Sequence, residues 1–125
     1  EAARIAEETR RKLLATGRSL IAETVFSHPS KVGFVRDATR AGCTLVLHVL
    51  MVPEDLAVHR VAYRVRAGGH DVPAEKIRRR YRRLWVNVAS AARMASTVTF
   101  YDNTAHAGPR IVARLTAASS RRPVR

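Results

Sequence analysis

The stretch CTLVLHVLM (43–51) decides how the rest of the sequence is interpreted. It is a nearly unbroken apolar run of strand length, the pattern expected when both faces of a parallel sheet are covered. Cys43 falls inside this run and is predicted to be a buried strand residue. His48 lies in the middle of the run, and we expect a core histidine with a hydrogen-bond partner rather than a ligand. A buried strand of this kind favours an α/β protein.

Residues typical of helix starts and ends divide the sequence around this strand. Serine, proline and acidic residues favour the first turn of a helix, whereas glycine favours the position just after the last turn. On this basis we predict helices over 1–16 ending at Gly17, over 31–41 between Ser30 as cap and Gly42, and from Pro53 to about Ala67, and a further helix that opens at Pro73 and includes Ala92. The first is expected to turn Ile5, Ala6, Leu13 and Leu14 inward, and the last Ile77, Tyr81, Leu84, Trp85, Val88 and Ala92.

Three further segments, 19–26, 97–103 and 110–115, are predicted to be strands. Strands that alternate with helices indicate an α/β fold with a mainly parallel sheet. The domain is expected to span residues 1–116. The small, polar and basic tail of 117–125 is expected to be flexible.

The sequence is strongly basic, with 23 Lys and Arg against 10 Asp and Glu, a formal net charge of +13. Such a charge favours anionic partners such as nucleic acid, nucleotides, phosphorylated sugars or acidic lipids, although an arginine-rich proteome would give the same balance. The single cysteine excludes a disulfide framework and a cysteine zinc site. No apolar stretch reaches the length of a membrane span and no signal peptide is visible, so we expect a cytoplasmic protein without a membrane partner.

The most unusual stretch is RVRAGGHDVPAEKIRRRYRRLW (64–85). Two glycines followed by a proline predict a tight hinge between two helices, with His70 and Asp71 inside it. His70 could contact a phosphate and Asp71 could cap the next helix, although turn formation alone also explains both. The arginines that follow are Arg78, Arg79, Arg80, Arg82 and Arg83. They predict either a phosphate grip shared with Arg64 and Arg66 or a solvated basic face.

Two other segments carry candidate polar groups. Glu23 comes late in the predicted strand 19–26, where the acids of parallel strands face a ligand crevice. It could hold a sugar hydroxyl or a magnesium-bound water, or simply end the strand. The YDN segment (101–103) could contact a nucleotide base or cap a turn. The sequence contains no GxxxxGK[ST] and no GxGxxG, and its histidines show no spacing that predicts a metal site.

The segment PEDLAVHRVAYRVRAGGHDVPAEKIRRRYRRLW (53–85), followed by YDNT (101–104), resembles the zeta-toxin-like P-loop kinases. Those proteins commonly show R-V-x-x-R-V-x-x-G-G-H-D-V-P-x-x-x-I-x-R-R-Y-x-R and a later Y-D-N-S. The upstream ETVFS, FVRDATRAG and LVLHVLM also resemble the family in the same order, so the similarity covers about residues 1–115. It implies a P-loop kinase-like three-layer α/β fold, ATP and Mg²⁺ as cofactors, and phosphorylation of UDP-N-acetylglucosamine in the toxin branch. It also implies an antitoxin protein as a partner.

The resemblance assigns roles to individual residues. Arg64 and Arg80 match the catalytic arginines that hold the ATP phosphates in the transition state. Glu23 matches the acid that contacts the sugar substrate. The positions expected to bind the nucleotide are His70, Arg83, Asp102 and Asn103, and a helical lid is expected over about 53–95.

The family's first strand, its Walker A loop with a lysine, and the aspartate that accepts the substrate proton have no counterpart in this sequence. Because positioning of the phosphates dominates phosphoryl transfer, we expect this chain alone to be inactive. One alternative is a basic domain that binds nucleic acid through residues 76–83. The inward positions of Tyr81 and Trp85 disfavour it, because they leave no aromatic side chain interleaved with the arginines for base stacking. The other alternative is a non-catalytic homo-oligomer that covers the open sheet edge.

Overall fold

The computed structural model describes residues 1–117, so residues 118–125 of the predicted basic tail lie outside the described residues. The described elements are α1 (Ala2–Ala15), α2 (Ser30–Arg40), β1 (Val46–Met51), α3 (Glu54–Arg66), α4 (Ala74–Ala92), β2 (Thr97–Asp102) and β3 (Arg110–Thr116). Every predicted helix is present, and each helix end that was predicted differs from the observed one by at most one residue. The predicted α/β class is therefore confirmed.

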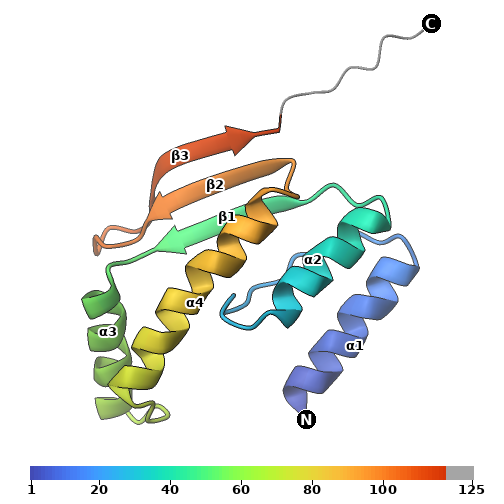
Figure 1. Cartoon of the computed structure of the whole chain (residues 1–125). Helices are drawn as coiled ribbons and strands as arrows, with labels where there is room; N and C mark the ends of the chain where they lie inside the picture. The colour runs from blue at the N-terminus through green and yellow to red at the C-terminus, as the bar shows by residue number, and fades with distance from the viewer. Residues whose placement is uncertain (118–125) are drawn as a thin grey trace, which may run out of the picture.

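The three strands form one mixed sheet in the order β1-β2-β3 (Figure 1). β1 and β2 are parallel, with Val46 opposite Thr97 and Met51 opposite Asp102. β3 runs antiparallel to β2. The parallel pair needs a long crossover, which α3 and α4 supply, whereas the short connection over 103–109 can only return the chain beside β2 in the opposite direction. The sheet is thus parallel where helices connect its strands and antiparallel where a turn does.

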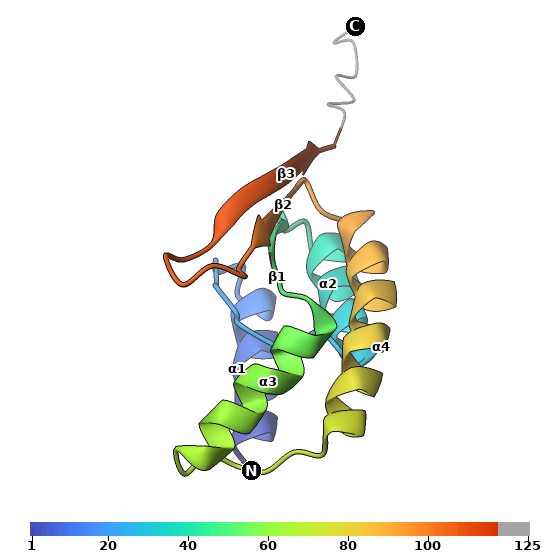
Figure 2. The same cartoon turned by 90° about the vertical axis from the view of Figure 1, so that its left-hand side faces the viewer.

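Helices α2 and α4 lie on the same side of the sheet (Figure 2). On that side Val49 and Val98 pack with Val88 of α4 and with Ala95, and Leu84, Trp85 and Phe100 surround them. Val32, Val35 and Ala38 of α2 are also buried, and Ala91 of α4 is fully buried. The core is therefore small and lies between α4 and the parallel strand pair.

The opposite face of β1 is exposed, which corrects the prediction that both faces are covered. Val46 and Leu50 are 52% and 56% exposed. His48 shares this face and is exposed, so it is not a core residue, but its Nδ1 lies 2.8 Å from the Tyr101 hydroxyl. Cys43 precedes the strand and is only half-buried. A continuous apolar run predicted burial on both faces, but within residues 1–117 helices cover only one face of this strand.

The strand predicted over 19–26 is not formed. Residues 21–25 are exposed and lie in an irregular segment that leads from α1 to α2. Only its end is fixed, where the Asn87 side-chain amide donates to the Phe26 carbonyl at 2.9 Å. Because a strand exists only through its ladder, apolar composition alone does not make one when no described segment pairs with it.

Helix α1 is loosely attached. None of its residues is buried, and Ile5, predicted to face inward, is 51% exposed. Ala6, Leu13 and Leu14 are half-buried. Arg10 of α1 packs against α2, where its guanidinium lies 5.8 Å from the centre of the Phe34 ring.

Candidate functional site

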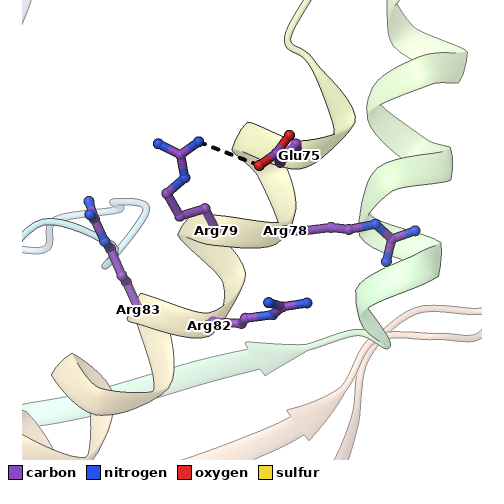
Figure 3. A pocket seen from close by; sticks show the side chains of 5 residues that line it. All are labelled: Glu75, Arg78, Arg79, Arg82 and Arg83. Carbon is purple, nitrogen blue, oxygen red and sulfur yellow. Dashed lines mark ion pairs between the residues drawn. The ribbon is translucent and has the colours of Figure 1, made fainter.

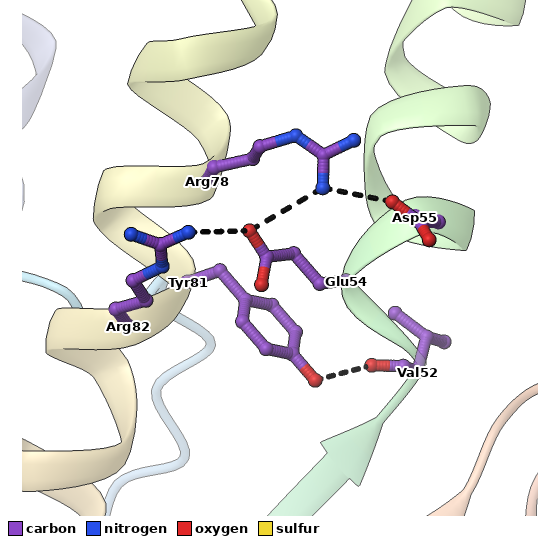
Figure 4. A network of polar contacts seen from close by, with 6 residues as sticks. All are labelled: Val52, Glu54, Asp55, Arg78, Tyr81 and Arg82. Carbon is purple, nitrogen blue, oxygen red and sulfur yellow. Dashed lines mark hydrogen bonds and ion pairs between the residues drawn. The ribbon is translucent and has the colours of Figure 1, made fainter.

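Helix α3 and residues 74–85 of α4 form a two-helix arm at the carboxyl end of β1 (Figure 1). Pro53 separates strand from helix, and its carbonyl accepts the first helical bond, from Ala57 N–H at 3.0 Å. The Tyr81 hydroxyl donates to the Val52 carbonyl at 2.9 Å, which ties α4 to the end of β1 (Figure 4). Ligands of α/β sheets bind outside the carboxyl ends of parallel strands, so the arm lies on the side of the sheet where a ligand is expected.

The arm turns through the predicted glycine hinge. Gly68 has φ +91°, and its N–H donates to the Val65 carbonyl at 3.0 Å. The Gly69 N–H donates to the Arg64 carbonyl at 2.8 Å, and a Cβ at Gly69 would lie 2.8 Å from that same oxygen. These two bonds close a Schellman motif, which requires the left-handed conformation at Gly68 and leaves no room for a side chain at Gly69.

His70 and Asp71 follow the hinge and are exposed. Helix α4 begins after Pro73 and has no side-chain hydrogen bond at its cap, so the prediction that Asp71 caps it is wrong. Ser30 likewise does not cap α2; it is the first helical residue, and its N–H donates to His28 Nδ1 at 3.1 Å. Pro29 before α2 and Pro73 before α4 fix the chain direction without a capping side chain.

The exposed side of α4 carries a hollow lined by arginines, which we call the arginine hollow. Its lining residues are Glu75, Arg78, Arg79, Arg82 and Arg83 (Figure 3). Arg78 and Arg82 are directed toward α3, whereas Arg79 and Arg83 are directed away from it (Figure 3). The side chains of Arg79 and Arg82 are 62% and 76% exposed, so the guanidinium groups are accessible to a ligand.

Acidic residues at the start of α3 neutralise part of this charge (Figure 4). Arg78 donates to Asp55 at 2.8 Å and to Glu54 at 3.4 Å, and the hydrogen bond to Asp55 is the main reason that the pKa of Arg78 is raised. Arg82 lies 3.8 Å from Glu54, and Arg79 lies 3.9 Å from Glu75. Within residues 1–117, Arg83 takes part in none of these ion pairs. The arginine hollow is therefore a positively charged surface with incomplete internal compensation, which suits an anion.

The profile of the zeta toxin family matches residues 1–107, which include the arm, its hinge and the end of β2. The chain belongs to the zeta toxin family. No curated protein and no solved structure matches it. Membership makes the chain a relative of kinase-like toxins and confirms the resemblance drawn from the arm's sequence. Strand β3 lies beyond the matched residues.

The structure places the predicted zeta toxin site residues in different surroundings. Arg83 lines the arginine hollow, whereas Arg64 and Arg80 are exposed on the arm but do not line it. His70 is also outside the hollow. Glu23 is exposed in the irregular segment before α2 and not at the end of a strand. Roles implied for these residues by the zeta toxin resemblance stay predictions.

Asp102 and Asn103 shape the turn after β2. Asp102 Oδ1 accepts from Thr104 N–H at 3.0 Å, and Oδ2 lies 3.6 Å from Arg110. Hydrogen bonds from Thr104, then the charge of Arg110, lower the pKa of Asp102. The Asn103 N–H donates to the Met51 carbonyl at 2.8 Å. Asp102 thus holds the turn, as the simpler interpretation of YDN predicted, whereas the Asn103 N–H links the start of the turn to β1.

Sequence reasoning missed the residues that join the arm to the sheet. Arg60 donates to the carbonyls of Asn103 and Thr104 at 2.9 and 3.2 Å, linking α3 to the turn after β2. Glu54 and Asp55 were interpreted only as helix-start residues. Two consecutive acids are more than a helix start needs. Together with the arginine run on the next helix, they were the signal that could have identified these ion pairs.

Two absences concern the residues that the structure describes. No helix within 1–117 is both long and apolar enough to cross a membrane. Over the same range, no group of three or more His, Cys, Asp or Glu residues is placed to hold a metal ion.

Proposed function

We propose that this chain supplies the lid and the acceptor-facing part of an ATP-dependent kinase that phosphorylates a sugar nucleotide such as UDP-N-acetylglucosamine. The observation that carries this proposal is the arginine hollow, set on a glycine-hinged arm at the carboxyl end of a parallel strand pair in a zeta toxin chain. The complete domain is proposed to have the P-loop kinase-like three-layer fold.

The arginine hollow has the chemistry of a phosphate lid. Guanidinium groups bind phosphate oxygens in pairs and do not lose their charge, and they stabilise the negative charge of a transferring phosphoryl group. Arg79 and Arg83 are directed to the same side of the helix, away from α3 (Figure 3). The glycine turn joins α3 to α4 at the tip of the arm. Near the sheet, Tyr81 bonds to Val52 and Arg60 bonds to the turn after β2, so the two helices are held as one unit.

The remaining roles follow the family. In this proposal Arg64 and Arg80 contact the transferring phosphoryl group, and Glu23 holds the sugar. The nucleotide contacts are His70, Arg83, Asp102 and Asn103. The carboxylates suited to Mg²⁺ are scattered among the described residues, so the ion would arrive with the nucleotide phosphates, as it commonly does.

This chain has no phosphate-binding loop motif and no assigned base to take the acceptor hydroxyl proton. We therefore propose that it is inactive alone and acts together with a segment that supplies both. An antitoxin and a second copy of the chain are its predicted protein partners. The exposed face of β1 with Val46 and Leu50 favours the second copy, and the mass in solution tests it.

The test of the proposed function is ATP turnover with UDP-N-acetylglucosamine. We expect none from the chain alone and measurable turnover once a segment carrying the phosphate loop is joined to it. In that active form, Arg80→Ala should abolish most turnover, while the matched change Arg93→Ala, at the far end of α4, should not. Unchanged turnover in Arg80→Ala would refute the assigned role.

A further inference from the structure

Glu54 occupies a special place among the acids near the arginine hollow. One of its oxygens, Oε1, lies 3.4 Å from Arg78 and 3.8 Å from Arg82 (Figure 4). Its side chain is 27% exposed, whereas those of Asp55 and Glu75 are 88% and 89% exposed. A single carboxylate oxygen therefore sits between two guanidinium groups, as a phosphate oxygen would.

The spacing of the arginines shows what this contact changes. Arg79, Arg82 and Arg83 stand at i, i+3 and i+4, so their side chains are neighbours on one face of α4. Arg79 and Arg83 are directed away from α3, but Arg82 is turned toward it, where Glu54 lies (Figures 3 and 4). The contact with Glu54 thus keeps Arg82 apart from Arg79 and Arg83, with which it would otherwise form an anion site of three arginines.

The contact is also loose enough to exchange. A charge-assisted hydrogen bond between nitrogen and oxygen is about 2.7–2.9 Å long. Arg78 reaches that length only with Asp55, at 2.8 Å. Arg78 can therefore remain bonded to Asp55 and hold α3 against α4 while Arg82 leaves Glu54.

We propose that Glu54 is a displaceable internal anion of the arginine hollow. In the empty protein it holds Arg82 toward α3, and an oligophosphate ligand takes its place by drawing Arg82 to the side of Arg79 and Arg83. This inference rests on the proposed function, because it assumes that the hollow binds phosphates. Glu54 then sets the affinity of the hollow: only an anion that offers more than one carboxylate-like contact displaces it.

The test is binding of inorganic triphosphate to the full chain, measured by calorimetry at low salt. Glu54→Gln should bind about two- to fivefold more tightly than the unchanged chain, since an exposed ion pair that competes is of that strength. Glu54→Asp is the decisive variant because it keeps the charge but shortens the reach, and it should also bind more tightly. Glu75→Gln removes the same charge from the lining and should have a smaller effect than Glu54→Gln.

Thermal unfolding supplies a second readout. Loss of the Glu54 contact should lower the stability of the chain slightly while it raises affinity, so the two measurements move in opposite directions. A purely structural role would lower both stability and affinity, and that outcome would overturn the proposal. Equal gains in Glu54→Gln and Glu75→Gln, with none in Glu54→Asp, would reduce the effect to net charge and overturn it too.

The same experiment separates this inference from the proposed function. Triphosphate binding that is weakened in Arg83→Gln, but unaffected by Glu54→Gln, retains the lid and rejects the displaceable acid. Binding detected in Glu54→Gln but not in the unchanged chain supports both. Failure of every form of the chain to bind triphosphate rejects both.

Discussion

The two ends of helix α4 differ in burial and in the contacts that hold them. At its carboxyl end Val88 and Ala91 are buried against the sheet, with 5% and 0% exposure. At its amino end, residues 75–83 expose arginines and meet α3 through polar contacts. Helix α3 itself has no buried residue, whereas α2, beside the core end, has three. One continuous helix thus joins a region held by buried apolar side chains to a region where apolar side chains are at most half-buried and ion pairs join the two helices.

The two kinds of contact indicate which part of the molecule can move. Burial of apolar groups resists any displacement, whereas exposed ion pairs contribute at most about 1 kcal/mol each and exchange readily. Segments that close over ligands come from the less stable parts of a protein. The arm has the properties of such a segment, and the core end has those of its anchor.

The largest expected effect is at the core end. Ala91→Asp would place an unpaired carboxylate at a fully buried site and should destabilise the chain by about 3 to 5 kcal/mol. Ala89→Asp, two residues earlier on the exposed side of the same helix, should change stability by about 0.5 kcal/mol or less. Chemical denaturation compares the two, and similar losses would show that α4 is not anchored as described.

The hinge comes next. Gly69→Ala would push a methyl group against the Arg64 carbonyl and should cost about 1 to 2 kcal/mol. Gly33→Ala, within α2, meets no atom within 4 Å and should instead stabilise by about 0.5 to 1 kcal/mol. Opposite signs in thermal melts would sharpen the contrast, and a stabilising Gly69→Ala would contradict the Schellman hinge.

A smaller loss is expected where the arm meets β1. Tyr81→Phe removes the bond to the Val52 carbonyl and should cost about 1 kcal/mol. Tyr63→Phe provides the control, because Tyr63 is 68% exposed and its hydroxyl makes no hydrogen bond within residues 1–117. Equal stability of the two variants in denaturant would mean that this bond does not secure the arm.

The smallest effect concerns pH at the turn after β2. The pKa of Asp102 is lowered from its ordinary value of 3.8, so its contribution is present above that pH and is lost as pH falls through the lower, folded value. The amide signal of Thr104 in NMR should therefore titrate below pH 3.8, and Asp102→Asn should remove the transition. A transition above the ordinary value would reverse the sign assigned to this contact.

The contrast between the two ends also explains what sequence could predict. Helix bounds followed from Pro53, Pro73 and the glycines because these residues restrict the backbone locally. The segment 19–26 and the exposed face of β1 did not follow, because strand pairing and burial depend on which other segments are present.

At the site, sequence located the arginines but not their partners. Ile77 and Tyr81 fixed which face of α4 turns inward, and hence which arginines are exposed. The contacts of Glu54 and Asp55 with Arg78 join residues more than 20 positions apart, and helix periodicity carries no information about such pairs.

Triphosphate binding by a pair of matched arginine variants tests whether the arm end of α4 is an oligophosphate lid. Arg83→Gln removes a guanidinium of the arginine hollow, and Arg93→Gln removes an exposed one beyond the far end of the same helix. Both lose one charge. We expect Arg83→Gln to weaken binding about tenfold, as for loss of a charged hydrogen-bond donor, and Arg93→Gln to leave it nearly unchanged. Equal weakening in the two variants would show that only net charge attracts the ligand and would contradict the lid.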